Sequence, residues 1–145
     1  MTLVVDASVL VAALIDTGPD GTWALELLSE EPLAAPHLMP AEVTNILRRA
    51  VLAGEVSDRH ATGAHRDLGD LRVALFPYEA VATRVWELRG NVTAYDAWYV
   101  ALAELLGAPL ATLDAKLANA PGPRCPFLTP PAPPVTARYQ LRPSG

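Results

Sequence analysis

The sequence predicts an α/β domain with a central, mostly parallel sheet of four to five strands flanked by helices. Short apolar segments alternate along the chain with longer segments of helical character, which is the pattern of parallel α/β folds. The chain has 145 residues, the length of one ordinary domain, and 51% of them are hydrophobic, enough to fill a core. We therefore assign residues 1–128 to one domain and residues 129–145 to a tail.

The chain begins with a predicted strand and two predicted helices. Residues 3–6 contain a short apolar run that suits a buried strand, and the apolar residues 7–15 predict a helix directly after it. Residues 16–21 are rich in turn-forming residues and predict a loop. A second helix is expected over 22–30, with Trp23 and two leucines on its inner side.

The next segment predicts a strand and two helices. Residues 32–36 are short and apolar enough for a second buried strand. Pro40 suits the first turn of a helix that runs to about residue 53, just before Gly54. Ser57 suits the N-cap of a more polar helix that reaches about residue 71.

The remaining elements continue the alternation, and the expected helix after Thr93 is apolar nearly all round and hence buried. They are a strand over 72–76, a helix over 79–88, a helix over 94–106, a strand over 109–112, a short helix over 115–120 and an edge strand over 124–128. The tryptophans, Trp23, Trp86 and Trp98, are expected in the core. Eight of the 14 prolines lie in the last 25 residues, so the tail is predicted to be extended or disordered.

The overall composition predicts a cytoplasmic protein with no membrane partner. No apolar run is long enough to span a bilayer, and the first residues lack the basic region of a signal peptide. Cys125 is the only cysteine, which excludes an internal disulfide and fits a reducing compartment. The net charge of −5 argues against nucleic acid as a partner, unless a cluster of acids reserved for a metal distorts the sum.

Four acidic residues stand where strands end or helices begin, and each has a simple structural explanation. Asp6 and Asp114 could cap the helices that follow them, and Asp96 completes a capping box that starts at Thr93. Glu42 lies in the first turn of its helix, where a negative charge offsets the positive end of the helix dipole. Taken one at a time, capping is the favoured interpretation of each residue.

Taken together, the four acids predict a metal-dependent catalytic site. Strand ends and helix starts of a parallel sheet meet at one edge, which is where such folds bind ligands. Two carboxylates about 4 Å apart repel by roughly 4 kcal/mol at an effective dielectric of about 20, so a cluster needs protons or a cation. Oxygen ligands favour Mg²⁺ or Mn²⁺, and a pair of such ions is a known device for phosphodiester hydrolysis. The predicted catalytic and metal-binding residues are Asp6, Glu42, Asp96 and Asp114.

Neighbouring polar residues suit supporting roles. Ser8 and Thr112 carry hydroxyls two residues from an acid, near enough to orient a carboxylate or a water molecule. Asn45 is one turn beyond Glu42 and could hold its carboxylate or contact a phosphate. Arg48 and Arg49 could bind the nucleic-acid backbone, although a solvated helix face explains them equally well.

The four acidic segments, in this order and at these separations, resemble the motifs of PIN-domain ribonucleases, and most closely those of the VapC-type toxins of bacterial toxin–antitoxin pairs. They are residues 5–10 (VDASVL), 42–47 (EVTNIL), 95–97 (YDA) and 111–114 (ATLD). Each segment alone is short, but the ordered set is specific. The resemblance covers about residues 3–128 and does not extend to the proline-rich segment, whose role it leaves open.

The resemblance implies a PIN-like three-layer nuclease domain that cleaves RNA. It implies that Asp6 and Asp96 are the principal metal ligands and that Glu42 and Asp114 complete the acidic pocket. It further implies a homodimer, inhibited by a small antitoxin protein that binds an apolar groove near the first helices. Apolar side chains available there, unless they only pack the core, are Val9, Leu10, Ala13, Leu14, Trp23 and Leu27.

Other functions fit the sequence less well. A phosphatase of the haloacid-dehalogenase type needs a second aspartate where this chain has Ser8, and a phosphate-accepting receiver domain needs an acidic pair and a late lysine. No glycine-rich phosphate loop is present. The remaining alternative is a catalytically idle PIN-like domain that binds RNA or a protein partner. Which RNA is cleaved is not encoded in any motif, because single-stranded RNA is recognised through shape and splayed bases.

Overall fold

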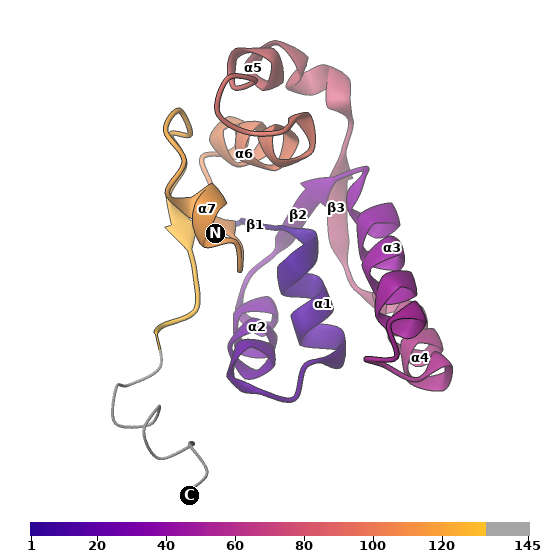
Figure 1. Ribbon diagram of the computed structural model, residues 1–145. Coiled ribbons are helices and arrows are strands. Elements are labelled where there is room, and N and C mark those ends of the chain that lie inside the picture. Colours follow the sequence, from indigo (N-terminus) through magenta and orange to yellow (C-terminus); the bar gives the residue numbers. More distant parts are fainter. Residues whose placement is uncertain (133–145) are drawn as a thin grey trace, which may run out of the picture.

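A computed structural model describes residues 1–132 and contains a five-stranded sheet between two layers of helices (Figure 1). The strand order is β3-β2-β1-β4-β5, and every neighbouring pair is parallel. The strands are β1 (Leu3–Val5), β2 (Leu33–Pro36), β3 (Val73–Phe76), β4 (Leu110–Ala111) and β5 (Phe127–Leu128). The predicted parallel sheet is therefore confirmed, with β5 at an edge as expected.

The helices divide between the two faces of the sheet. Helices α1 to α4 lie on one face, and α5 and α6 lie on the other (Figure 1). Helix α1 packs against α2, α3 and α4, whereas α6 packs against α5 and strands β1, β2 and β4. The helices are α1 (Ala7–Ile15), α2 (Pro19–Glu30), α3 (Met39–Leu52), α4 (Asp58–Asp70), α5 (Ala82–Glu87), α6 (Ala94–Leu106) and α7 (Ala115–Ala118), with a 3₁₀ turn η1 (Tyr78–Ala80). This arrangement confirms the three layers that the resemblance implied.

The central strand β1 delivers the chain to the edge of the sheet where the acids were expected. Its three residues are at most 2% exposed, because helices cover both faces of a parallel sheet. Asp6 follows directly and is itself only 8% exposed. A short buried strand thus places a carboxylate at the carboxyl edge of the sheet, against the core.

Helix α2 begins at Pro19, three residues before the predicted start. Proline fits the first helical position because its missing N–H would have no partner there. Gly21 was expected in the loop but lies inside the helix, where a Cβ would stand only 1.8 Å from the carbonyl oxygen of Asp16. A residue that signals a turn in the sequence is here a glycine required by the close approach of α2 to the end of α1.

Several other helices and strands are shorter than predicted. Strands β4 and β5 contain two residues each, and the helix expected over 79–88 is divided into η1 and α5 at Val81, whose φ is −128°. Trp86 was expected in the core but is 66% exposed, with the Arg89 guanidinium 4.3 Å from its ring centre. That prediction was wrong because the indole meets a cation at the surface instead of the core.

The end of the described chain has no regular structure. Residues 129–132 form neither helix nor strand, and residues 133–145, most of the predicted tail, lie outside the described residues. Over residues 1–132, none of the helices is long and apolar enough to cross a membrane.

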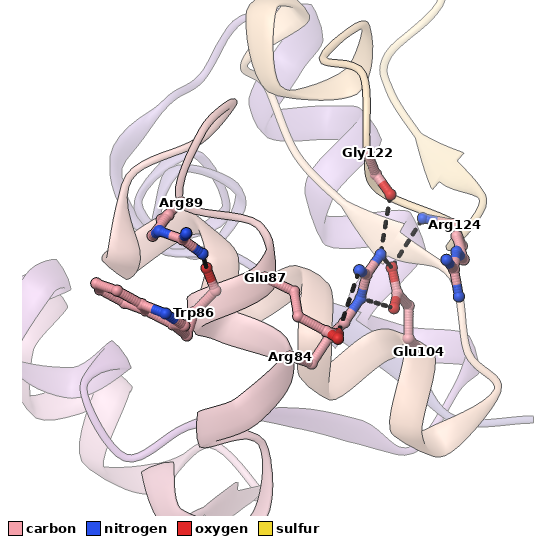
Figure 2. A network of polar contacts seen from close by, with 7 residues as sticks. All are labelled: Arg84, Trp86, Glu87, Arg89, Glu104, Gly122 and Arg124. Atoms are coloured by element: carbon pink, nitrogen blue, oxygen red, sulfur yellow. Dashed lines mark hydrogen bonds and ion pairs between the residues drawn. The ribbon is translucent and has the colours of Figure 1, made fainter.

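An ion-pair network ties the α5–α6 layer to the loop before β5 (Figure 2). The Arg84 guanidinium donates to both carboxylate oxygens of Glu104, at 2.7 and 3.2 Å, and to the carbonyl of Gly122 at 2.9 Å. Glu104 also accepts the backbone N–H of Arg124 at 2.8 Å. The network holds the edge of the sheet beside β4, the strand that leads to Asp114.

Glu104→Gln is expected to lower the free energy of unfolding by about 1–3 kcal/mol, because hydrogen bonds to charged partners are lost at a pair that is largely buried. Denaturant titration followed by circular dichroism measures this loss. Glu87→Gln is the matched control: its 3.7 Å pair with Arg84 is 57% exposed on the glutamate side and should change stability by less than about 0.5 kcal/mol. Equal losses in both variants would contradict a structural role specific to Glu104.

Candidate active site

The four acids come from separate elements and lie at the carboxyl edge of the sheet. Asp6 follows β1, and Asp114 follows the segment after β4. Glu42 lies in the first turn of α3, and Asp96 lies in the first turn of α6. The four acids are close enough to affect one another's pKa values. The charge of Asp96 raises the pKa of Asp6, the charges of Asp96 and Asp6 raise that of Glu42, and the charge of Asp114 raises that of Asp96.

Asp6 has two roles in the structure. One carboxylate oxygen caps α1 by accepting the N–H of Val9 at 3.1 Å and the hydroxyl of Ser8 at 2.5 Å. The other oxygen accepts the hydroxyl of Thr112, which is fully buried. The capping interpretation is therefore correct for Asp6, and two hydroxyls also fix the direction of its carboxylate.

Ser8 and Thr112 also join the ends of β1 and β4. The Ser8 hydroxyl oxygen accepts the N–H of Leu113 at 3.2 Å, and the Thr112 hydroxyl oxygen accepts the N–H of Asp114 at 3.0 Å. Asp114 in turn caps α7, because one of its carboxylate oxygens accepts the N–H of Lys116 at 2.9 Å and that of Leu117 at 3.3 Å. Two acids that are 108 positions apart in the chain are thus held by one hydrogen-bond network.

Glu42 and Asp96 are held differently. The hydroxyl of Tyr99, which is 2% exposed, donates to Glu42 Oε1 at 2.6 Å. Thr93 caps α6 by accepting the backbone N–H of Asp96 at 3.2 Å. The Thr93 side chain also lies close enough to the Asp96 carboxylate to lower its pKa by hydrogen bonding.

The environment of Asp6 opposes its negative charge. Burial raises the pKa of the Asp6 carboxyl, and the nearby charge of Asp96 raises it further. The hydrogen bonds that Asp6 accepts offset only part of this rise. A carboxyl in this position gains free energy from a proton or a cation.

Glu42 and Asp96 show the same electrostatic conflict. Burial raises the pKa of Glu42, and the charges of Asp96 and Asp6 add to the rise, while the bond from Tyr99 counters it. Burial also raises the pKa of Asp96, followed by repulsion from Asp114. Burial raises the pKa of the Tyr99 hydroxyl as well, so this group stays protonated and acts as a donor. Three acids with raised pKa values at one sheet edge are typical of a functional site.

The donor set fits Mg²⁺ or Mn²⁺ better than a softer ion, since every candidate ligand is a carboxylate oxygen. Among residues 1–132, however, no three His, Cys, Asp or Glu side chains lie close enough to enclose an ion. Mg²⁺ keeps several water ligands and is commonly bound through one or two carboxylates, so it does not require three side chains around the ion. The excess of unneutralised acid and the choice of donor atoms both favour a hydrated divalent cation.

The predicted substrate contacts lie on α3 away from this network. Asn45, Arg48 and Arg49 are exposed, and in the described residues no hydrogen bond joins them to the four acids. Asn45 and Arg48 instead line a groove of about 650 Å³ between α3, α4 and β3. Its other walls are mostly apolar, and they include Leu75 of the edge strand, which is 39% exposed.

The apolar surface expected near the first helices is smaller than predicted. Val9 and Leu10 are fully buried and cannot line a groove. Trp23 is partly exposed and lines a shallow hollow together with Pro130 and Pro131. Pro130 and Pro131 therefore lie near α2 in the region where a free groove was expected.

The family of the chain follows from comparison with known proteins. Residues 3–123 match the PIN domain family. This chain belongs to the PIN domain family. It is 46% identical over 123 residues to Ribonuclease VapC1 of Mycobacterium tuberculosis, a match that spans 84% of this chain and 92% of the relative. The predicted membership of the VapC-type branch is thereby confirmed.

Solved structures agree with this assignment of the VapC-type PIN domain. PAE2754 from Pyrobaculum aerophilum superimposes with a TM-score of 0.62 at 28% identity, over 88% of this chain and 83% of the other. VapBC-5 from Mycobacterium tuberculosis, a member of the VapBC family of toxin–antitoxin systems, superimposes with a TM-score of 0.50 at 26% identity, over 81% and 88%.

Sequence reasoning missed Tyr99. It lies three residues after Asp96 on the same helix, in a run assigned to the buried core as a whole. A buried tyrosine nearly always needs a partner for its hydroxyl, and positions i and i+3 share a helix face. Those two rules together would have directed the Tyr99 hydroxyl toward the acids.

Proposed function

We propose that this VapC-type PIN domain is a Mg²⁺- or Mn²⁺-dependent endoribonuclease and the toxin of a type II toxin–antitoxin system. The main support is the position of four carboxylates at one sheet edge, where burial and mutual repulsion raise the pKa of three of them. The name of Ribonuclease VapC1, at 46% identity, supports RNA as the substrate. The alternative is an idle PIN-like domain that binds RNA or a partner.

Each acid has a distinct part in the proposed reaction. Asp6, fixed by two hydroxyls, and Asp96, whose charge raises the pKa of Asp6, would hold the cation. Glu42 and Asp114 would complete the pocket and orient water. When bound, a divalent cation makes water a better nucleophile and stabilises the developing charge on the leaving oxygen. The protein's own contribution is to bury Asp6 and partly bury Glu42 and Asp96, which reduces the hydration of their charges.

The proposed partners are RNA, a small antitoxin protein and a second copy of the chain. The antitoxin is proposed because VapBC-5 is named as a member of a toxin–antitoxin family. The apolar groove between α3, α4 and β3 offers it surface. Homodimerisation is proposed from the family resemblance. A cytoplasmic location is proposed because the lone cysteine, Cys125, is buried and unpaired among the described residues.

The proposed activity is tested by incubating the purified protein with total cellular RNA in Mg²⁺, Mn²⁺ or EDTA. We expect discrete fragments with either metal and none with EDTA, and mapping the fragment ends identifies the substrate. Asp96→Asn is a better inactive control than Asp6→Asn. Asp6 uses both carboxylate oxygens to cap α1 and to bind Thr112, so its amide would disturb the fold as well as the site.

Calorimetric titration with Mn²⁺ separates the proposal from the idle alternative. Binding by the wild-type protein, weakened in Asp96→Asn, supports the metal site. If the intact protein binds no Mn²⁺ and cuts no RNA, the idle alternative is favoured. A small protein that copurifies with the chain would instead point to inhibition by an antitoxin, and removing it under denaturing conditions should restore cleavage.

A further inference from the structure

Tyr99 is a buried side chain that links an acid of the proposed site to the opposite layer of helices. It belongs to α6, whereas its acceptor, Glu42, belongs to α3. These helices lie on opposite faces of the sheet (Figure 1). The 2.6 Å bond therefore reaches past the carboxyl edge of the sheet, across the site itself.

The bond constrains a side chain that would otherwise move. Glu42 is half-buried, has a long flexible side chain and is repelled by Asp96 and Asp6. Without a donor, rotation toward solvent would lower this repulsion and add hydration. The hydrogen bond from the Tyr99 hydroxyl to Oε1 limits the rotation of the Glu42 carboxylate.

Packing alone does not explain the hydroxyl. A phenylalanine would fill the same core volume without bringing a polar group to a site that is 2% exposed. The hydroxyl is satisfied only because Glu42 is there, and Tyr99 shares its helix face with Asp96. One turn of α6 thus presents an acid and, beside it, the donor that holds another acid.

We propose that Tyr99 is a positioning residue of the metal site, which holds the Glu42 carboxylate in the orientation that supports the cation. This inference rests on the proposed metal-dependent function. Residues that orient metal ligands through hydrogen bonds commonly contribute 10- to 100-fold to metal affinity or activity. Tyr99 acts on the reaction through Glu42 and does not itself touch RNA or the cation.

The test is Mn²⁺ affinity, measured by calorimetry on the full-length protein and on Tyr99→Phe. Removing only the hydroxyl should weaken Mn²⁺ binding by about 10-fold and lower kcat at a fixed, subsaturating Mn²⁺ concentration, with KM for RNA unchanged. Tyr78→Phe is the matched control. Tyr78 contacts Trp98, which lies on the other side of α6 from Asp96, so loss of its hydroxyl should leave Mn²⁺ affinity unchanged.

A double-mutant cycle shows whether Tyr99 acts through Glu42. Tyr99→Phe should have no further effect on Mn²⁺ affinity in a Glu42→Ala background, since the group it positions is gone. An equal loss in both backgrounds, or wild-type affinity in Tyr99→Phe, overturns the inference while the metal site stands. Absence of Mn²⁺ binding by the wild-type protein overturns the metal site and the inference with it. Circular dichroism melting in EDTA verifies that each variant is folded before titration.

Discussion

Asp96→Asn is expected to reduce the rate of RNA cleavage by about 10³-fold and to leave the fold intact. Removing one carboxylate from a metal-dependent site costs several kcal/mol of transition-state stabilisation, and roughly 4 kcal/mol corresponds to this factor. Unlike the carboxylates of Asp6 and Asp114, that of Asp96 accepts no backbone N–H among residues 1–132, and its hydrogen-bond partner is Thr93 of its own capping box. Its loss should therefore affect the chemistry more than the folding.

The metal-free variant should be at least as stable as the wild-type protein. The cap of α6 survives, because the Thr93 hydroxyl accepts the backbone N–H of residue 96, and the oxygen of an asparagine side chain can still accept a hydrogen bond from Thr93. Asparagine removes the charge that raises the pKa of Asp6 and Glu42, and this relief opposes the small loss at the helix dipole, about 0.3–1 kcal/mol. Stability measured in EDTA should not fall.

Asp58→Asn is the matched control for this substitution. Asp58 is also in the first turn of a helix, α4, but it is exposed and outside the four acids. The Asp58→Asn variant should lose a few tenths of a kcal/mol of stability and keep its full activity. Initial rates of cleavage in Mn²⁺ and denaturant titrations in EDTA measure both quantities. Full activity in Asp96→Asn would show that Asp96 is not part of the site.

The sequence predicted the architecture because the determining patterns are local. The run Leu3–Val5, the capping box at Thr93 and the proline at position 40 each depend on a few adjacent residues. The order of the elements then restricts the topology, since parallel strands need crossover helices. The convergence of four acids on one edge follows from this topology, without knowledge of the strand order.

The features that were missed depend on distant contacts. Gly21 reads as a turn residue until the carbonyl of Asp16 is seen where its Cβ would be. Trp86 reads as core until its helix is found to turn that face outward, where Arg89 covers the ring. Tyr99 contacts a residue 57 positions away, and no local pattern marks that pairing. Hydrophobicity identifies the buried helix but not the acceptor of its one buried hydroxyl.

Without metal, the acidic site is expected to lower the stability of the protein as the pH rises. The pKa values of Asp6, Glu42 and Asp96 are all raised in the folded state, so over the interval above their unfolded values the folded protein binds more protons than the unfolded chain. The stability they contribute is fully present below the unfolded pKa values, near pH 4, and is lost as the pH rises through the folded ones.

Other groups titrate in the same range, so a difference between variants isolates the site. Burial raises the pKa of Glu104, but the hydrogen bonds from Arg84 and from the Arg124 N–H outweigh it and leave that pKa low. The contribution of Glu104 to the stability of the protein is therefore lost as the pH falls, which is the opposite of the effect of the three site acids. This loss is the same in the wild-type protein and in Asp96→Asn. Subtracting the two unfolding free energies, measured in EDTA from about pH 4.5 to 8, cancels its contribution.

The subtracted curve should show that the unfolding free energy of Asp96→Asn increases relative to that of the wild-type protein as the pH rises. At neutral pH, Mn²⁺ should make the wild-type protein more stable than Asp96→Asn. An ion that binds only the folded state adds about 2.7 kcal/mol to the free energy of unfolding when its concentration is 100 times its dissociation constant. The wild-type protein would receive most of this gain and the variant little. Parallel curves in EDTA would mean that Asp96 is too far from the other acids to repel them. The electrostatic conflict from which we infer the cation would then be absent, whatever the activity of the variant.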